Sequence, residues 1–228
     1  MIGIIGAMEV EVCNLKNAVE NPVTKTVSGI DFVSGKIKGK DVVIAKAGVG
    51  KVNAAVCAQT MILLYSPHVI INTGVAGSLS SAAGVGDIVI ATATVQHDMD
   101  TSPLGDPVGF ISGINMVQLP CDNETVNKLF TAAGNVGGFK AVGGIIATGD
   151  VFLNSNEIKN RIVKTFGASA GEMEGGSIGQ VCVINKVPYA VVRAISDNAD
   201  GSSHVDYPTF VKTAAENSTR LMLEYIAL

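Results

Sequence analysis

The sequence of 228 residues has no tryptophan, few aromatic residues and no run of basic side chains. Its four cysteines, Cys13, Cys57, Cys121 and Cys182, lie far apart, and none belongs to a C-x-x-C pair. The three histidines are equally scattered. This spacing argues against a disulfide framework and against a zinc site, and it favours a reducing, cytoplasmic interior. We expect neither a metal nor an organic cofactor.

Positive charge is also scarce, because the chain has three arginines and a net charge of -4. This balance argues against nucleic acid or an anionic membrane as a partner. The N-terminal apolar run has no basic segment before it and is interrupted by Glu9 and Glu11, so it does not predict a signal peptide. No apolar run reaches the ~18 residues of a membrane-spanning helix.

Glycine, in contrast, is abundant, with 26 residues that separate short Val/Ile-rich runs from longer amphipathic segments. This alternation predicts one α/β domain over residues 1–228, with a parallel or mixed sheet flanked by helices. The predicted strands are Ile2–Ile5, Asp31–Ile37, Asp41–Ala47, Val69–Thr73, Asp87–Val95, Ala141–Thr148 and Pro188–Ile195. The predicted helices are Met8–Glu20, Lys51–Tyr65, Asn123–Ala133, Asn156–Phe166, Gly175–Asn185 and Pro208–Ile226, with Asp122 as an N-cap and Pro208 as a first helical residue. The early strands, from about residue 23 to 47, break the alternation and predict some antiparallel pairing.

Two glycine-rich segments follow predicted strands. "AGVGKVN" departs from the phosphate-binding loop at Ala45 and Val52, so it predicts a tight strand-to-helix turn that could still line a pocket. "NTGVAGSL", which contains Gly74 and Gly77, is either a tight turn or a backbone cradle for a polar ligand. "GIIGAM" lacks the G-x-G-x-x-G spacing, so no dinucleotide site is supported.

Acidic residues stand at three predicted helix starts or strand ends. Glu174 precedes a helix, where it either complements the helix dipole or binds a ligand. In "VVRAISDNAD", a buried strand carries Arg193, Ser196 and Asp197 toward its carboxyl end, where ligands of open α/β sheets bind. An arginine inside such a strand needs a charged partner, whereas Asp197 could also be only the N-cap of a turn.

Helix geometry distinguishes the two glutamates of "AMEVEV". On a helix from Met8, Glu11 lies beside apolar residues, whereas Glu9 lies between Lys16 and Glu20. Glu11 is therefore the better candidate for a buried, reactive carboxylate. A long segment, 97–120, carries three prolines and three glycines. It is either a functional loop or a surface excursion.

Together these segments resemble the 5′-methylthioadenosine/S-adenosylhomocysteine nucleosidases of the purine nucleoside phosphorylase superfamily. The matching motifs keep their order over nearly the whole chain: "IGIIGAMEVEV", "AGVGKVNAA", "INTGVAG", "GDIVIATATVQHDMD", "TGDVFL", "EMEG" and "VVRAISDNAD". The resemblance implies a single domain with a twisted mixed central β-sheet flanked by helices, like that of nucleoside phosphorylases and hydrolases, and a homodimer.

The resemblance also implies roles for individual residues. Glu11 matches the family's water-activating acid, and Asp197 matches the acid that protonates adenine N7. Glu174, with Met173, matches the contacts to the ribose hydroxyls. The remaining matches are pocket or supporting positions: Met8, Val49, Gly77, Phe152, Leu153, Arg193, Ser196 and Tyr207.

The implied reaction is hydrolysis of the N-glycosidic bond of an adenine nucleoside, a step of methionine salvage and methyl-cycle recycling. The chemical requirements of this reaction agree with the implied roles, because cleaving that bond requires one carboxyl to protonate the base and another to activate water. The family's substrates, 5′-methylthioadenosine, S-adenosylhomocysteine and 5′-deoxyadenosine, are not ranked by the sequence, and an aminofutalosine-like nucleoside stays open. The alternatives are a phosphorylase on the same scaffold and an inactive nucleoside sensor. Two departures bear on specificity: Val75 stands where many relatives carry Ser, and the 97–120 segment is unlike the aromatic-rich versions of some relatives, although Phe110, Leu104 or Met116 could substitute.

Overall fold

The computed structural model describes residues 1–198 and 203–228, and of residues 203–208 it describes the backbone only. Within this part of the chain, ten strands form one mixed sheet. The strands are β1 (Ile2–Gly6), β2 (Glu20–Val27), β3 (Ile30–Ile37), β4 (Lys40–Lys46), β5 (Val69–Ser78), β6 (Ile88–Gln96), β7 (Leu119–Pro120), β8 (Ala141–Thr148), β9 (Ala168–Glu172) and β10 (Tyr189–Asp197). All seven predicted strands are present. The additional ones, β2, β7 and β9, are exposed, very short or rich in small residues, so they lack the apolar signal of a strand.

The helices also agree with the sequence pattern. They are α1 (Glu9–Asn17), α2 (Lys51–Tyr65), α3 (Asn123–Val136), α4 (Asn156–Phe166), α5 (Gly175–Asn185), α6 (Ser203–Ala227) and the short 3-10 turn η1 (Ser102–Leu104). Asp122 is confirmed as the N-cap of α3, because its carboxylate accepts a bond of 2.8 Å from the Thr125 N–H. The predicted start at Pro208 is wrong, since α6 begins at Ser203. A proline near a helix N-terminus removes at most one intrahelical hydrogen bond, so it does not exclude an earlier start.

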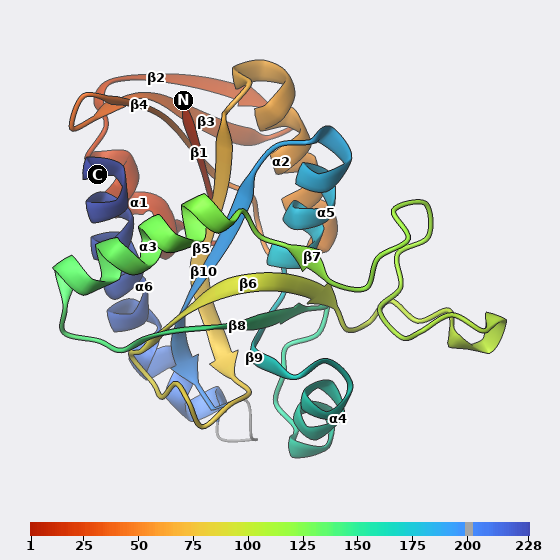
Figure 1. The fold of residues 1–228 in the computed structure, drawn as a ribbon. Coiled ribbons are helices and arrows are strands. Elements are labelled where there is room, and N and C mark those ends of the chain that lie inside the picture. Colours follow the sequence, from red (N-terminus) through yellow and green to blue (C-terminus); the bar gives the residue numbers. More distant parts are fainter. Residues whose placement is uncertain (199–202) are drawn as a thin grey trace.

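Strand order explains why the sheet is mixed. β5 pairs in parallel with β1 and β10, whereas β6 runs antiparallel to β10. The predicted antiparallel pairing early in the chain is confirmed, because β3 pairs antiparallel with both β2 and β4. Figure 1 shows α1, α3 and α6 on one side of the sheet and α2 and α5 on the other. The fold is thus the predicted α/β sandwich of a mixed sheet between helices.

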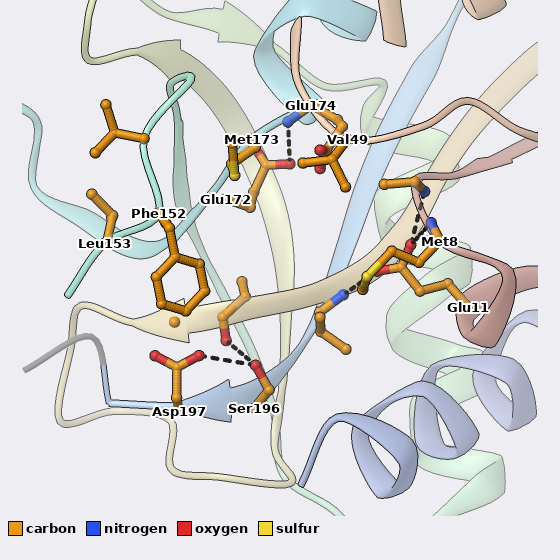
Figure 2. A pocket seen from close by; sticks show the side chains of 16 residues that line it. Met8, Glu11, Val49, Phe152, Leu153, Glu172, Met173, Glu174, Ser196 and Asp197 are labelled. Atoms are coloured by element: carbon orange, nitrogen blue, oxygen red, sulfur yellow. Dashed lines mark hydrogen bonds between the residues drawn. The ribbon is translucent and has the colours of Figure 1, made fainter. Parts of the chain in front are cut away.

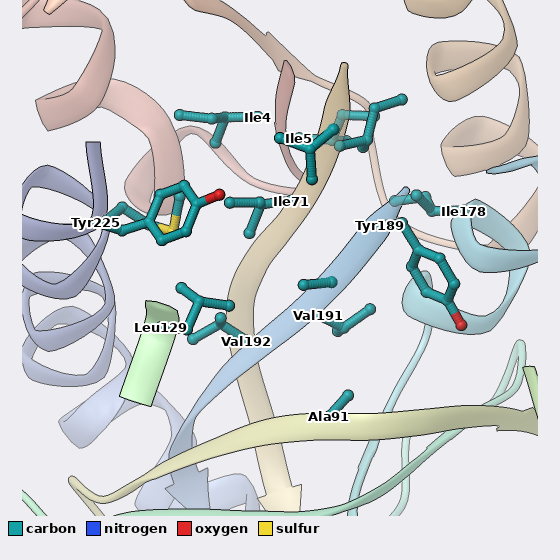
Figure 3. Packing of buried hydrophobic residues seen from close by; sticks show 14 of the residues in the cluster. Ile4, Ile5, Ile71, Ala91, Leu129, Ile178, Tyr189, Val191, Val192 and Tyr225 are labelled. Carbon is teal, nitrogen blue, oxygen red and sulfur yellow. The ribbon is translucent and has the colours of Figure 1, made fainter. Parts of the chain in front are cut away.

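The core lies against β1, β5 and β10, all of whose residues are buried. Apolar side chains of these strands, including Ile4, Ile71 and Val191, are fully buried against helices of both layers (Figure 3). Burial on both faces is typical of strands that read as continuous apolar runs. Polar residues inside such strands, Asn72 and Arg193 among them, are the exceptions that require a specific partner.

Residues 72–78 of the glycine-rich segment 72–79 form the second half of β5, so the tight turn, one of the two interpretations of the sequence, is wrong. Its backbone pairs with β10 on one side, where Arg193 is opposite Gly74, and with β9 at its end, where Gly171 is opposite Gly77. These pairings satisfy the backbone polar groups, so small residues do not end the strand. A Cβ atom at Gly74 would lie 2.6 Å from Oε1 of Glu11, so the glycine permits a close approach of that carboxylate.

The segment between β6 and β7 projects from the body of the molecule (Figure 1). It contains η1 and an isolated bridge between Ile111 and Met116. Leu104, in η1, is 84% exposed. The two interpretations of this segment, functional loop or surface excursion, stay open. Among the described residues, none of the helices combines the length and apolar character that crossing a membrane requires.

Candidate active site

A cavity of about 360 Å³ lies where the carboxyl ends of β1, β5, β9 and β10 meet the starts of α1 and α5. This size lies within the range of ~300–1,000 Å³ typical of small-molecule sites. Its location agrees with the rule that ligands of open α/β sheets bind at the carboxyl ends of the strands. Figure 2 shows the side chains that line it. They are Ala7, Met8, Glu11, Val49, Val75, Ala76, Gly77, Val151, Phe152, Leu153, Gly171, Glu172, Met173, Glu174, Ser196 and Asp197.

All but two of the predicted site residues line this cavity. Arg193 instead lies behind it, against two of the lining carboxylates. Tyr207 belongs to α6, but its side chain lies outside the described residues. The sequence analysis assigned no role to the lining residues Ala7, Ala76, Val151, Gly171 and Glu172, and it named Val75 only as a departure from relatives. Each is one or two positions from a predicted residue, so adjacency in the motifs was the signal available.

Glu11 is buried, with 4% of its surface exposed. Oε2 accepts bonds of 2.8 Å from the N–H groups of Ala7 and Met8, and Oε1 accepts one of 3.1 Å from Val75. Burial raises the pKa of Glu11, while the charge of Arg193 and these amide bonds oppose the rise. The carboxylate is therefore held in one orientation by backbone donors, and it retains a raised affinity for a proton.

Glu9 has the opposite environment, as its neighbours in the sequence predicted. Its carboxylate is exposed and forms an ion pair of 3.0 Å with Lys16. Both glutamates stand in the first turn of α1, so the favourable position near the helix dipole does not distinguish them. Contact with β5 does, because Val75 lies against Glu11 and not against Glu9. The predicted difference between the two surroundings is confirmed.

Asp197 is the last residue of β10 and is 2% exposed. The hydroxyl of Ser196 donates to Asp197 Oδ2 at 3.0 Å. Figure 2 shows this pair and Glu11 on different sides of the cavity. Two buried carboxyl groups, one from α1 and one from β10, therefore face one cavity, which is the arrangement that acid–base cleavage of a glycosidic bond uses.

Arg193 is 1% exposed and forms an ion pair with Glu172, which ends β9. The expectation that a strand arginine needs a charged partner is confirmed. Glu172 also accepts bonds of 3.0 and 2.7 Å from the N–H groups of Glu174 and Gly175, at the start of α5. Glu172 is thus occupied by donors, and it fixes the backbone from which Glu174 projects.

Glu174 is the N-cap of α5 and is buried against two other charged groups. Its Oε1 accepts a bond of 2.9 Å from the Gly50 N–H, and its Oε2 lies 3.7 Å from Arg193. Burial and the negative charge of Glu172 raise the pKa of Glu174 to about 7, against the lowering effect of Arg193. This carboxyl therefore changes its charge near neutral pH.

Thr148 connects these groups from the end of β8. Its hydroxyl donates to Glu172 and accepts a bond of 2.6 Å from the Gly176 N–H, and the side chain is fully buried. Replacing Thr148 by valine should lower the free energy of unfolding by about 1–3 kcal/mol, because a buried N–H then loses its partner. Urea denaturation measures this change. The matched control is Thr131→Val, whose hydroxyl is exposed and bonds within α3; an equal loss there would contradict the assignment.

Comparisons with known proteins show which family the chain belongs to. The sequence profile of the Phosphorylase superfamily matches residues 1–227. A 5′-methylthioadenosine/S-adenosylhomocysteine nucleosidase of Shewanella halifaxensis is 39% identical over 223 residues, which cover 97% of this chain and 96% of the relative. The Neisseria meningitidis nucleosidase of the same name, crystallised with methylthio-immucillin-A, is 34% identical with a TM-score of 0.96, covering 99% of this chain and 98% of the other. A futalosine hydrolase of Helicobacter pylori is 32% identical with a TM-score of 0.94, covering 99% and 96%.

Proposed function

The chain belongs to the phosphorylase superfamily and, within it, to the 5′-methylthioadenosine/S-adenosylhomocysteine nucleosidases, which are N-ribosyl hydrolases, and we propose that it releases adenine from such nucleosides by the two-carboxyl mechanism below. The observation that carries the mechanism is the pair of buried carboxyl groups, Glu11 and Asp197, on different sides of one cavity.

Asp197 is proposed to act as the acid. Adenine is a poor leaving group as an anion, so a proton must reach N7 as the bond to the ribose breaks. A protonated Asp197 at the end of β10 supplies that proton, and the Ser196 hydroxyl at 3.0 Å orients its carboxyl group. Phe152 and Leu153 would hold the base beside it, the first by stacking and the second through its backbone, with Gly77 lining the same region.

Glu11 is proposed to act as the base that activates water. The three backbone donors of Ala7, Met8 and Val75 keep its carboxylate directed at the cavity, so little reorganisation is needed during the reaction. Water attacks the anomeric carbon from the ring face opposite the leaving base, across an oxocarbenium-like transition state. Deprotonation by Glu11 makes that water nucleophilic as the positive charge develops.

Glu174 is proposed to bind the ribose. As a carboxylate it accepts hydrogen bonds from both the 2′ and the 3′ hydroxyl, and Met173 packs beside the sugar. Arg193 supports the two neighbouring glutamates, because it pairs with Glu172 and lies 3.7 Å from Glu174. Met8 and Val49, at the cavity wall, would contact the 5′ substituent.

The rival phosphorylase reaction fits the site less well. Phosphate needs cationic or amide clamps, and Arg193, the arginine nearest the described cavity, is already bound to Glu172 and Asn72. The ionised Glu11 would also repel phosphate. An inactive sensor, the other alternative, would have no use for an acid and a base on different sides of the ligand.

The decisive experiment is adenine release from 5′-methylthioadenosine in phosphate-free buffer, followed by chromatography. We expect turnover that does not depend on phosphate. A strict phosphate requirement would establish the phosphorylase, and tight binding of an adenosine analogue without base release over hours would favour the sensor.

Substrate range within the hydrolase reaction needs a second comparison. The structural similarity extends to the Neisseria meningitidis nucleosidase and to a futalosine hydrolase with nearly equal TM-scores. Relative kcat/KM on 5′-methylthioadenosine, S-adenosylhomocysteine, 5′-deoxyadenosine and aminofutalosine would rank the four. We propose the first two as the main substrates, which places the reaction in methionine salvage and methyl-cycle recycling, with 5′-deoxyadenosine as a further one.

The pH dependence of kcat/KM tests the role of Glu174. Its pKa of about 7 means that the ribose-binding carboxylate is half protonated at neutral pH in the free enzyme. Since kcat/KM reports groups of the free enzyme, it should rise with pH through about 7, as Glu174 ionises. In Glu174→Gln this rise should disappear, at a lower plateau. An unchanged inflection near pH 7 in that variant would assign the titration to another group.

We also propose a homodimer, which the resemblance to the nucleosidases implies. Apolar side chains of the neighbouring helices α2 and α5 are exposed, including Val52 and Leu63, each 73%, and Ile184, 61%. The two helices contact each other through a hydrogen-bonded pair, Gln59 and Asn185. Such a patch favours burial against a second copy of the chain. A monomeric mass in solution would contradict this proposal.

A further inference from the structure

A closed ring of hydrogen bonds lies just outside the cavity, at the start of α2. Lys51 supplies two donors: its backbone N–H bonds to Asp150 Oδ1 at 2.8 Å, and its ammonium group bonds to Asp98 Oδ1 at 2.6 Å. The backbone N–H of Asp150 donates to Asp98 Oδ2 at 2.9 Å and completes the ring. Asp98 follows β6, Asp150 follows β8 and Lys51 follows β4, so the ring joins three separate segments.

The same helix start also binds Glu174. Gly50, the N-cap of α2, has no side chain to bond to the first amides of the helix, which leaves these N–H groups to other partners. The N–H of Gly50 donates to Glu174 at 2.9 Å, and the next N–H, of Lys51, donates to Asp150 at 2.8 Å. Two adjacent amides thereby set the distance between the ribose-binding carboxylate and the loop that begins at Asp150.

This loop depends on its two ends for its position. Leu153, at one end, is 5% exposed and packs in a cluster with Val95 and Phe166. Asp150, at the other end, is exposed and is held by the ring. Between them, Val151 and Phe152 line the cavity although they are 43% and 49% exposed. The Phe152 ring, which Figure 2 shows on the same side of the cavity as Asp197, is therefore placed by the loop's anchors more than by its own burial.

We propose that Asp150 is a positioning residue that, together with Lys51 and Asp98, holds the Phe152 loop at a fixed distance from Glu174, so that the cavity is preformed for a base and a ribose joined by one bond. The proposal rests on the nucleosidase function above. None of the three ring residues lines the cavity, so each acts through its neighbours. Partial burial opposes ionisation of Asp98, but the bonds from Lys51 and from the Asp150 N–H outweigh it and lower the pKa of Asp98, which keeps the ring charged.

The test uses Asp150→Ala in the full-length chain. Without the ring, the loop must be ordered each time a nucleoside binds, so KM for 5′-methylthioadenosine should rise about tenfold. The acid and the base stay in place, so kcat should change less than about threefold, as for a loss of uniform binding. Lys51→Met and Asp98→Asn should each raise KM in the same direction. The double variant should raise KM little more than the larger of the two single effects, because both substitutions remove the same ion pair.

Asp122→Ala is the matched control. Asp122 also bonds to the first amides of a helix, but α3 does not line the cavity. We expect a lower Tm and an unchanged KM for this variant. The proposal is overturned if soluble Asp150→Ala keeps the wild-type KM. It is also overturned if this variant loses kcat at an unchanged KM, which is the result expected of a partly unfolded enzyme.

Two further measurements keep the outcomes separate. If Asp150→Ala does not fold, Lys51→Met carries the test, because it leaves both backbone amides of the helix start in place. If the wild-type chain releases no adenine, the proposed function has failed; the ring is then tested by the Kd of 5′-methylthioadenosine in place of KM. A Kd that is equal in the wild type and in Lys51→Met would overturn the positioning role independently.

Discussion

Glu11→Gln is expected to lower kcat for adenine release by about 10²–10⁴-fold, the usual contribution of a positioned general base. Glutamine preserves the size of the side chain, and its carbonyl oxygen can still accept one of the bonds from Ala7, Met8 or Val75. It cannot take a proton from water. The fold should therefore persist while the nucleophile is no longer activated. Steady-state kinetics on 5′-methylthioadenosine, with circular dichroism to confirm the fold, measures the effect.

Glu9→Gln is the control for this experiment. Glu9 stands two residues away in the same helical turn, but it is exposed and pairs with Lys16. An exposed ion pair of this kind contributes little, so kcat and KM should stay close to the wild type. Near-normal turnover of Glu11→Gln, or an equal loss in both variants, would remove Glu11 from the mechanism.

Asp197→Asn should cause a loss of similar size, about 10²–10⁴-fold in kcat, for a different reason. Asparagine can hydrogen-bond to adenine N7 but cannot transfer a proton to it, so adenine would have to leave as an anion. Binding should be retained, because the stacking on Phe152 and the contacts of Glu174 do not change. A variant that binds 5′-methylthioadenosine with near-normal Kd and does not cleave it is the expected result.

The two carboxyl roles can be separated by the leaving group. A riboside whose leaving group is stable as an anion, such as 4-nitrophenyl riboside, does not need the proton from Asp197. Asp197→Asn should therefore lose much less activity on that substrate than on 5′-methylthioadenosine, whereas Glu11→Gln should lose activity on both. Equal losses of the Asp197 variant on both substrates would show that this residue does not act as the acid.

The sequence by itself determined the fold class and most of the elements. Alternation of apolar runs and amphipathic segments predicts an α/β domain, because a strand buried on both faces and a helix with one apolar face have different periods. The same local reasoning distinguished Glu11 from Glu9, since the neighbours of a residue on its own helix are readable from spacing alone. It also showed that Arg193 required a partner, because a charge inside a buried strand is too costly without one.

Tertiary structure alone decided which groups those partners are. Glu172 pairs with Arg193 because β9 and β10 both reach the end of β5, and strand order is not encoded in a local period. The continuation of β5 through Gly74 depends on pairing with β10. The local glycine content alone does not distinguish this strand from a turn. The ring of Lys51, Asp98 and Asp150 joins residues up to 99 positions apart. The sequence assigned none of the three a role, and only the folded sheet brings them together at one helix start beside the cavity.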